Sequence, residues 1–371
     1  MGKNTVSWVA LNLALCPNVL VLRSLLDRFG SPEAILAATE EDLGSIGGVS
    51  RRLIRRLKDP LLARAAGKEL RRAERLQARI LIRDDPGYPG ILAQLPDPPP
   101  LLYVRGDLQD SDDPAIAVVG SRRATTYGVE MARSLAAEIA SAGVTVVSGL
   151  ARGIDEAAHR GALEAGGRTL AFLGSGIDRI YPRESAPLAA SISLSGAVLS
   201  EFPLGTPPLP GNFPVRNRLI SGVSRGTLVV EAAPRSGSLI TARLALEQGR
   251  EVFAVPGRVT GEKAIGPNSL IQQGAKLVMR GRDVLEEIPG VALPAESSGP
   301  EPASEEAHGE EKAIFGALPE GEAVALDDLA AAVGTETGSL LAALLKLEME
   351  GKVRQLPGGR YLRKIRRGIV G

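Results

Sequence analysis

The sequence predicts an α/β protein whose main domain is a doubly wound, mainly parallel sheet, flanked by a helical domain and by a winged helix. Short apolar runs alternate with helical segments, and each run ends in a loop rich in Gly, Ser or Pro. Strands that are apolar throughout are typical of a parallel sheet with helices on both faces. We place this domain at residues 110–290. Its six predicted strands are AIAVVG, VTVVSG, TLAFLG, GAVLSE, TLVVEA and EVFAVPG.

Composition excludes several classes of protein. The chain has 371 residues, 44% hydrophobic and 23% charged, which is typical of a folded globular protein. Its only cysteine is Cys16 and its only histidines are His159 and His308, so neither an intramolecular disulfide nor a Cys/His metal site is expected. Polar residues and Pro17 interrupt the apolar N-terminal stretch, so we expect a cytoplasmic protein with no membrane span.

Charge is strongly segregated although the net charge is only +1. Residues 51–83 carry twelve basic and three acidic residues, residues 283–311 carry nine carboxylates and no Lys or Arg, and residues 351–371 carry seven basic residues and no acid. Any one run is equally explained as a solvated helix face. Basic runs in separate segments favour a polyanionic partner.

The N-terminal segment, residues 1–80, is predicted to form helices. Ser31 is an N-cap with Pro32 at the first helical position, and residues 43–49 form a Gly-rich turn between two helices. This turn resembles a helix-hairpin-helix within a SAM-like or helix-hairpin-helix-like domain, and a plain helix-turn-helix packing unit without DNA contact fits the short pattern as well. Residues 81–109 are rich in proline, so we expect a connector with little regular structure.

The C-terminal third divides into a linker and a small domain. Residues 291–310 have the Pro, Ser and Glu content of a disordered linker. Residues 311–371 predict three helices followed by two short strands around Pro357, Gly358 and Gly359, which is the order of elements in a winged helix.

Candidate binding residues follow the predicted strands, where ligands bind in open α/β sheets. Glycines allow close approach of the backbone, hydroxyl groups donate to phosphate oxygens, and arginine offers a forked pair of donors. Each loop alone could be a plain tight turn, but together with the segment FPVRNR they favour a phosphate or phosphodiester ligand. The candidates are Gly120, Ser121, Arg122, Arg123, Ser148, Gly149, Gly153, Phe213, Arg216, Asn217, Arg218, Ser236 and Ser238.

No cofactor or catalytic set is expected. The sequence has no GxGxxG followed by an acid at the usual distance and no GxxxxGK[ST]. His159 stands four residues after Asp155, a spacing that favours a contact on one helix face over a general base. We expect Asp155 and Asp178 to cap helices or to orient loop amides.

With these residues in view, the sequence resembles the DprA/Smf family of DNA-processing proteins. The resemblance covers about residues 115–278 almost without a break, and many ordered motifs at consistent spacing make it specific. The matching runs are AIAVVGSRRATTYG, VVSGLARGIDEAAHRGAL, LGSGIDRIYPRE, LSEFPLGTPP, FPVRNRLISGVSRGTLVVEA, SGSLITARLALEQGREVFAVPG and GPNSLIQQGAKLV.

The resemblance implies an extended Rossmann-like domain that binds single-stranded DNA, forms a homodimer and helps to load RecA recombinase during natural transformation. It implies a positive pocket made by the GSRR loop and the FPVRNR arginines, with Phe213 stacking on a base. It also implies a dimer contact through Ile271, Gln272 and Leu277. The chain departs from the family at Pro210, where several relatives carry a basic residue, and Arg225 or Arg235 is a possible substitute.

Two other functions remain open at this point. A nucleoside-phosphate hydrolase of similar fold would need a catalytic glutamate, and residues 232–242 contain no carboxylate. A duplex-binding regulator would read DNA through the third helix of the winged helix, but SLLAALLKLEMEGKV carries Glu348 and Glu350 and only two lysines.

Overall fold

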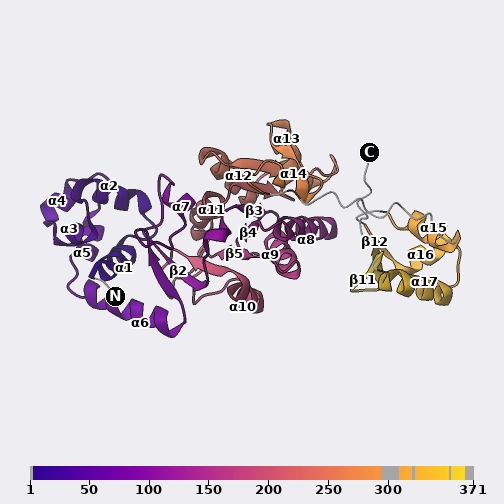
Figure 1. Cartoon of the computed structure of the whole chain (residues 1–371), viewed down its shortest axis with the longest axis horizontal. Helices are drawn as coiled ribbons and strands as arrows, with labels where there is room; N and C mark the ends of the chain where they lie inside the picture. The colour runs from indigo at the N-terminus through magenta and orange to yellow at the C-terminus, as the bar shows by residue number, and fades with distance from the viewer. Residues whose placement is uncertain (1–2, 292, 294–308, 320–321, 351, 364–371) are drawn as a thin grey trace. The chain divides into compact units, whose positions relative to one another are not determined.

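The protein forms two compact units in a computed structural model, which describes residues 3–291, 293, 309–319, 322–350 and 352–363 (Figure 1). The larger unit comprises residues 1–124 and 131–293, and the smaller unit comprises residues 125–130 and 294–371.

The larger unit is built on a nine-stranded sheet with the order β1-β2-β6-β5-β4-β3-β7-β8-β9. The strands from β6 to β9 in that order all run parallel, while β2 is antiparallel to both β1 and β6. All six predicted strands are confirmed, and they form the middle of the sheet. The strands are β1 (Arg79–Ile82), β2 (Leu101–Gly106), β3 (Ala115–Val119), β4 (Thr145–Ser148), β5 (Thr169–Phe172), β6 (Ala197–Ser200), β7 (Gly226–Val229), β8 (Glu251–Ala254) and β9 (Lys276–Leu277).

The prediction of a connector over residues 81–109 is wrong. This segment completes β1 and supplies β2, which pair in register from Ile82 with Leu101 outward, and it adds α7 (Gly90–Ala93). All six of its prolines lie between the two strands, where no sheet hydrogen bonds are required of them. The strand LLYVRG that follows has ordinary strand composition, and its first four residues are buried. The high proline content of the segment as a whole concealed this strand.

Helices cover both faces of the sheet, as the apolar strands predict. On one face α9 and α10 pack against the central strands, and α8 packs on α9 so closely that a Cβ atom at Gly161 would lie 2.1 Å from the carbonyl oxygen of Arg133. On the other face lie α7, α11, α12 and α13. The bounds are α8 (Thr126–Ser141), α9 (Ile154–Glu164), α10 (Ala186–Ser195), α11 (Asn212–Gly222), α12 (Gly237–Glu247), α13 (Ile265–Gln272) and α14 (Gly281–Leu285).

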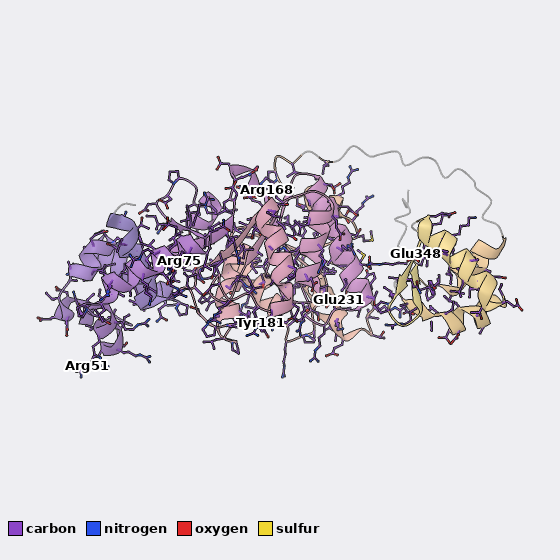
Figure 2. All side chains as sticks on the ribbon, turned by 90° about the horizontal axis from the view of Figure 1, so that it is seen from below. Arg51, Arg75, Arg168, Tyr181, Glu231 and Glu348 are labelled. Atoms are coloured by element: carbon purple, nitrogen blue, oxygen red, sulfur yellow. The ribbon has the colours of Figure 1, made fainter. Side chains whose placement is uncertain are left out.

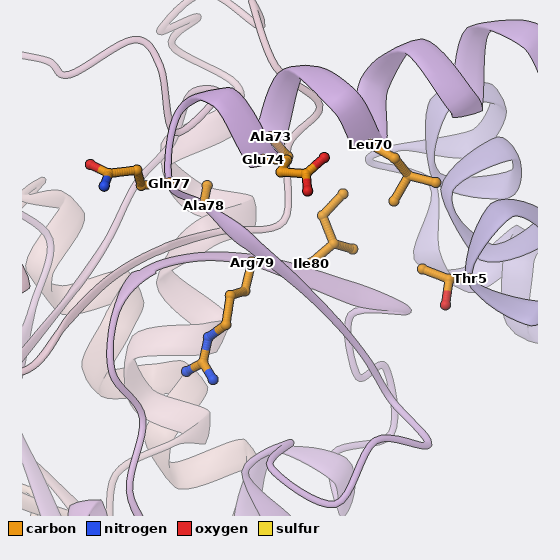
Figure 3. A pocket seen from close by; sticks show the side chains of 8 residues that line it. All are labelled: Thr5, Leu70, Ala73, Glu74, Gln77, Ala78, Arg79 and Ile80. Atoms are coloured by element: carbon orange, nitrogen blue, oxygen red, sulfur yellow. The ribbon is translucent and has the colours of Figure 1, made fainter. Parts of the chain in front are cut away.

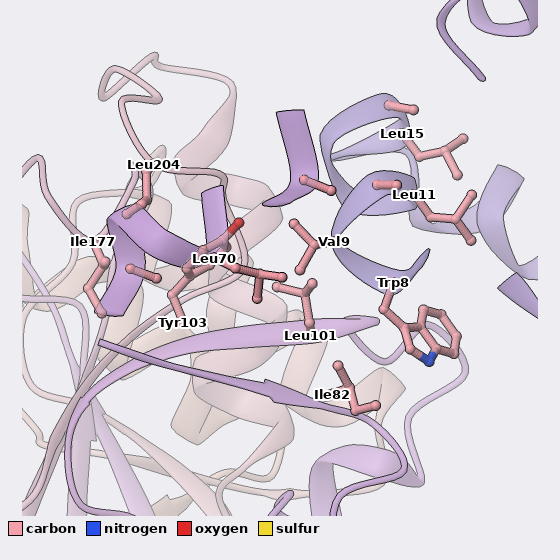
Figure 4. Close-up of a cluster of buried hydrophobic side chains, with 14 of the residues drawn as sticks. Trp8, Val9, Leu11, Leu15, Leu70, Ile82, Leu101, Tyr103, Ile177 and Leu204 are labelled. Atoms are coloured by element: carbon pink, nitrogen blue, oxygen red, sulfur yellow. The ribbon is translucent and has the colours of Figure 1, made fainter. Parts of the chain in front are cut away.

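The N-terminal segment is helical, as predicted, and Ser31 caps its third helix by accepting a hydrogen bond from the amide of Ala34 at 3.2 Å. Its helices share one hydrophobic core with the sheet, in which Trp8 and Leu11 lie beside Leu101 and Tyr103 (Figure 4). The segment is therefore part of the larger unit and not a separate body. The helices are α1 (Lys3–Leu15), α2 (Val19–Phe29), α3 (Pro32–Ala37), α4 (Glu40–Gly44), α5 (Arg51–Leu57) and α6 (Leu62–Arg75).

The smaller unit has the helix and strand order of a winged helix, with one further short strand. Its sheet has the order β10-β12-β11, and Gly358 and Gly359 turn the chain between the last two strands with positive φ angles of 83° and 65°. The elements are α15 (Gly309–Ala317), β10 (Ala323–Ala325), α16 (Leu326–Val333), α17 (Thr337–Met349), β11 (Val353–Leu356) and β12 (Arg360–Arg363). Almost all of the expected linker, residues 291–310, lies outside the described residues.

Across the described ranges, no single helix has the length and apolar character needed to cross a membrane. The pair α16 and α17 satisfies length and composition only when joined, and it bends by 107° at the break between them.

Candidate functional site

A pocket of ≈ 680 Å³ opens at the carboxyl ends of the central strands, between the loops after β3 and β7 and the first half of α11. We call it the loop-edge pocket. It brings together nine of the thirteen candidate residues, which come from segments far apart in the sequence. The nine are Gly120, Ser121, Arg122, Arg123, Phe213, Arg216, Asn217, Ser236 and Ser238.

Close backbone packing joins the loops that form this pocket. A Cβ atom at Gly120 would lie 2.6 Å from a side-chain carbon of Ile154, and one at Gly153 would lie 2.3 Å from the carbonyl oxygen of Ser121. Gly153 also has a positive φ of 80°, which favours glycine. The amide of Ser121 donates to the carbonyl of Glu231 at 2.7 Å. These glycines therefore hold three loops in contact and set the shape of the site.

Phe213 is the aromatic centre of the pocket. The guanidinium carbon of Arg122 lies 5.0 Å from its ring centroid and that of Arg216 lies 5.9 Å away. The ring of Tyr181 lies 5.9 Å from it, tilted by 48°. Gly174 leaves room for the phenyl ring, because a Cβ atom there would lie 2.9 Å from it. Two rings and two guanidinium groups thus meet at one place, an arrangement suited to a stacked base with a neighbouring phosphate.

Arg216 is almost completely buried below this pocket, with 4% of its surface exposed. It donates to the carbonyl of Gly149 at 2.9 Å and to the carbonyl of Phe172, and its Nε donates to the Asn217 side chain at 3.2 Å. Burial lowers the pKa of Arg216 to about 10, so the group still carries its charge at neutral pH. Its hydrogen-bond partners are neutral, and Asp155, which opposes the lowering of its pKa, forms no ion pair with it among the described residues.

Arg218 does not belong to the pocket, contrary to our prediction. Two residues along a helix point to nearly opposite sides, so Arg218 faces away from Arg216. It forms ion pairs with Glu201 and, at 3.4 Å, with Asp97, and it donates to the carbonyl of Asp97 at 2.9 Å. Burial raises the pKa of Glu201, and Arg218 opposes that shift. Arg218 therefore stabilises the fold where α11 meets the segment before β2.

Three further candidates support the pocket from behind rather than line it. The Ser148 hydroxyl is buried and donates to the carbonyl of Val118 at 2.6 Å, so the prediction that it contacts a ligand is contradicted. A Cβ atom at Gly149 would lie 2.6 Å from the Arg216 guanidinium, so glycine there makes room for that group. Gly153, described above, spaces the loops.

The exposed cations of the pocket are Arg122, Arg123 and Arg235. None of the three has an ion-pair partner within the part of the chain that the structure describes. Pro210 lines the pocket, so the pocket wall lacks the basic residue that several relatives carry at this position. Arg235 is placed to substitute for it, whereas Arg225 is paired with Asp113 before β3, at the other end of the strand, and is not.

Asp155 holds a loop amide, as expected, whereas His159 contacts Thr169 rather than Asp155, the partner that the helical spacing suggested. Asp155 accepts from the amide of Ala151 at 3.4 Å, and burial raises its pKa while Arg216 opposes the shift. His159 is fully buried with Nδ1 2.7 Å from the Thr169 hydroxyl. Since that hydroxyl donates to the carbonyl of Val146, His159 donates from Nδ1. Burial, assisted by Arg216, lowers the pKa of His159 to about 3.

Sequence reasoning gave no ligand-contacting role to Tyr181, although it quoted the residue within YPRE. A tyrosine in a loop gives no periodic signal, and its approach to Phe213 depends on how the β5 and β6 loops fold. Among the described residues, no group of three or more His, Cys, Asp or Glu side chains could hold a metal ion. A separate cavity of ≈ 450 Å³ lies between α1, α6 and β1 (Figure 3) and contains none of the candidate residues.

A mainly parallel sheet with a cationic, aromatic pocket at its strand ends, combined with a winged-helix unit, defines a protein of the nucleic-acid-binding class. The chain belongs to the DprA/Smf family. The model of the family described as DNA recombination-mediator protein A matches residues 79–289, and the DprA winged helix domain matches residues 298–359.

The relatives cover most of the chain. Protein Smf of Synechocystis sp. is 34% identical over 96% of this chain and 98% of its own length. Protein Smf of Escherichia coli is 44% identical over 76% of each chain. DNA processing protein A of Streptococcus pneumoniae superposes with a TM-score of 0.68 at 35% identity, covering 77% of this chain and 99% of its own.

A solved structure addresses the single-stranded DNA binding mode of DNA processing protein A from Helicobacter pylori. It matches with a TM-score of 0.51 at 31% identity, covering 56% of this chain and 94% of its own.

Proposed function

We propose that this protein binds single-stranded DNA in the loop-edge pocket and acts as a non-catalytic mediator of recombination. The observation that carries the proposal is that the guanidinium groups of Arg122 and Arg216 and the ring of Tyr181 all lie within 6 Å of the Phe213 ring centroid. Aromatic rings stack on bases of any sequence, and cations beside them neutralise the backbone, which is how single strands are held without reading sequence. The Helicobacter pylori relative, which binds single-stranded DNA, supports the same choice of ligand.

The test is a comparison of equilibrium binding to a single strand and to the duplex of the same sequence. Stacking requires an unpaired base, so the single strand should bind more tightly. Equal binding to both forms, or tighter binding to the duplex, would refute the proposal.

The partner to which the strand is delivered is a RecA-type recombinase in this proposal. The description of the family as a recombination mediator supports it, and natural transformation is the setting that the family implies. Addition of the protein should speed assembly of RecA on a strand already coated with single-strand-binding protein. Assembly at an unchanged rate would count against the RecA role and leave strand binding untouched.

The proposal that the protein is not an enzyme also has a direct test. Asp155 is the one carboxylate among the described residues that line the pocket, and it is buried. Incubation with nucleoside monophosphates should release no free base. Release of base that is lost in the Asp155→Asn variant would favour the hydrolase alternative instead.

A homodimer through the edge strand β9 is a further part of the proposal. Ile271 and Gln272 end α13, and Leu277 lies in β9, the last strand of the sheet, with 42% of its surface exposed. A sheet edge beside apolar side chains suits a self-complementary contact. Ile271→Glu should convert a dimer to a monomer in analytical ultracentrifugation, and an unchanged mass would exclude this contact.

The winged helix is proposed as a packing or protein-interaction module rather than a reader of duplex DNA. In α17 the only basic side chain is Lys346, which pairs with Glu350 at 3.9 Å, while Glu348 accepts from the amide of Gln355. This helix therefore offers little positive charge to a groove lined by phosphates. Tight, salt-sensitive binding of duplex DNA that is lost on Lys346→Gln would overturn this assignment.

A further inference from the structure

Helix α6 carries a stripe of unpaired positive charge that the loop-edge pocket does not explain. Arg64, Lys68, Arg71 and Arg75 stand at spacings of four, three and four, so they share one side of the helix. All four are exposed. None has a hydrogen-bond or ion-pair partner in the portion of the chain that the structure describes. We call this set the α6 stripe.

The opposite side of α6 explains why the stripe faces solvent. Ala66, Glu69, Leu70 and Ala73 are buried against α1 and the sheet. Glu74, the nearest exposed acid on the helix, lines the separate cavity beside β1 and points into it rather than along the stripe (Figure 3). The stripe is therefore not neutralised from its own helix.

One residue beside the stripe ties α6 to the loops that form the pocket. Arg72 has Lys68 and Arg75 as neighbours one turn away on either side, and it forms an ion pair with Asp178 at 3.5 Å. Asp178 also accepts from the amide of Gly205 at 2.7 Å. The stripe thus begins at the contact between α6 and the loops after β5 and β6.

The same two loops continue directly to the pocket. The first runs on from Asp178 through the exposed Arg179 to Tyr181, and the second runs from Gly205 to Pro208 and Pro210; Tyr181 and both prolines line the pocket. Figure 2 shows Arg75 on the side of the helical region nearer the sheet and Arg51 at its outer end. The contact between Arg72 and Asp178 therefore lies three residues along the chain from Tyr181 of the pocket.

From Arg64 to Arg75 the stripe extends about 16 Å along the helix axis at 1.5 Å per residue. That length suits several consecutive phosphates of an extended strand, and three of the four side chains are arginines, which offer forked donors to phosphate. No aromatic side chain belongs to the stripe, so it offers charge but no stacking platform.

We propose that the α6 stripe is a second binding surface for the same single strand, which leaves the loop-edge pocket over Tyr181 and runs along α6. This inference rests on the proposed function. The division of labour is specific: the pocket holds a base by stacking, and the stripe holds only the backbone that follows. Binding to α6 therefore requires a strand long enough to extend beyond the pocket.

The test compares two triple variants with the same change in charge. In the first, Arg64→Gln, Lys68→Gln and Arg71→Gln remove most of the stripe, and glutamine keeps the helix propensity nearly unchanged. In the matched control, Arg51→Gln, Arg52→Gln and Arg55→Gln remove three exposed arginines of α5 that have no ion-pair partner among the described residues. Each is titrated against single strands of about 5 and about 15 nucleotides, lengths within the range that single-strand sites occupy. Thermal unfolding verifies that both variants are folded.

We expect the α6 variant to bind the long strand more weakly, with the slope of log K against log salt reduced by about 2, since each phosphate contact contributes about 0.7. Its binding of the short strand should equal that of the unaltered protein, and the α5 control should keep both affinities. Equal losses in the two variants, or no loss in either, would overturn the proposal. So would a loss confined to duplex DNA or to vesicles of phosphatidylglycerol and phosphatidylcholine.

Failure of this inference and failure of the proposed function give different results. If the pocket variant Arg122→Ala binds both strands as well as the unaltered protein does, the pocket itself is not the site. If Arg122→Ala weakens binding of both strands while the α6 variant matches its control, the pocket stands and the stripe is excluded.

Discussion

The two sides of α11 hold one arginine each, and the two arginines have opposite consequences for function. Arg216 donates to neutral carbonyl groups and lies by the Phe213 ring, and Asp155 acts on it without forming an ion pair, so its charge is left facing the loop-edge pocket. Arg218 contacts Glu201 and Asp97, so its charge is cancelled on the spot. Both are nearly buried, at 4% and 7% exposure. Burial alone therefore does not tell a binding arginine from a structural one, but the charge of the contacting groups does.

The largest effect on stability should come from removing Arg218 and so breaking its ion pair with Glu201. Arg218→Met keeps the volume but leaves the buried Glu201 without its cation, and loss of one partner of a buried ion pair costs about 3–5 kcal/mol. Unfolding by urea should show that loss at neutral pH. The single-strand salt slope of the folded variant should stay unchanged.

A second substitution distinguishes this account from loss of packing. Glu201→Gln in the Arg218→Met background removes the stranded charge and should recover part of the lost stability. If Arg218→Met instead reduced the salt dependence of DNA binding without loss of stability, Arg218 rather than Arg216 would be the arginine of α11 that contacts DNA.

On the side of Arg216, the stability of the protein should depend on pH through His159. This residue is buried close enough to Arg216 to be affected by its charge. The pKa of His159 is lowered to about 3, below its ordinary 6.5. As pH falls below 6.5, the unfolded chain takes up a proton that the folded protein refuses, so acid favours unfolding through this residue.

The free energy of unfolding should therefore fall by about 1.4 kcal/mol more per pH unit in the unaltered protein than in His159→Asn, between about pH 6 and pH 4. Because the two proteins have the same carboxyl groups, the contribution of those groups to the pH dependence cancels in the comparison. Parallel pH curves would mean that His159 titrates normally and that the Arg216 side is less desolvated than the structure indicates.

How much of this the sequence could predict depends on the range of the interactions involved. The six central strands and the Ser31 cap follow from local patterns, because apolar runs and capping residues act within a few positions. The strand Leu101–Gly106 was missed because its proline neighbours dominated the local composition.

The site was predicted as a set of loops but not residue by residue. The role of Arg218 depends on Glu201 and Asp97, which are distant in sequence, and no local pattern reveals such a pairing. Helical geometry alone could have separated Arg216 from Arg218, since residues two apart do not share a helix face. The burial of Ser148 follows from its place at the end of an apolar strand, and this too was available in advance.

Phe213 tests whether the pocket side holds a base. Phe213→Leu keeps apolar volume but removes the ring, and base stacking on an aromatic side chain contributes about 1–3 kcal/mol. Single-strand affinity should fall by that amount while the salt slope is kept, because no cation is lost. Tyr181→Leu is the matched change, with a smaller expected loss since that ring is 47% exposed. If Phe213→Leu altered the slope and kept the affinity, Phe213 would be positioning Arg122 rather than a base.

The smallest expected effect is on the salt dependence of DNA binding, and it compares arginines without an ion-pair partner with an arginine that has one. Arg122 and Arg123 are exposed at the pocket without ion pairs, whereas Arg225 is similarly exposed but paired with Asp113 at 2.8 Å. Arg122→Ala should reduce the salt slope for single strands by about 0.7, and Arg122→Ala with Arg123→Ala by about 1.4 if each contacts one phosphate. Because these side chains are on the surface, the free energy of unfolding should change by less than about 0.5 kcal/mol.

Arg225→Ala removes the same formal charge far from the pocket and should leave the slope unaltered. Titrations over a range of salt concentrations measure all three variants. An equal decrease for Arg225→Ala would mean that the slope reports the net charge of the protein. In that case the distinction between cancelled and uncancelled arginines would not predict where DNA binds.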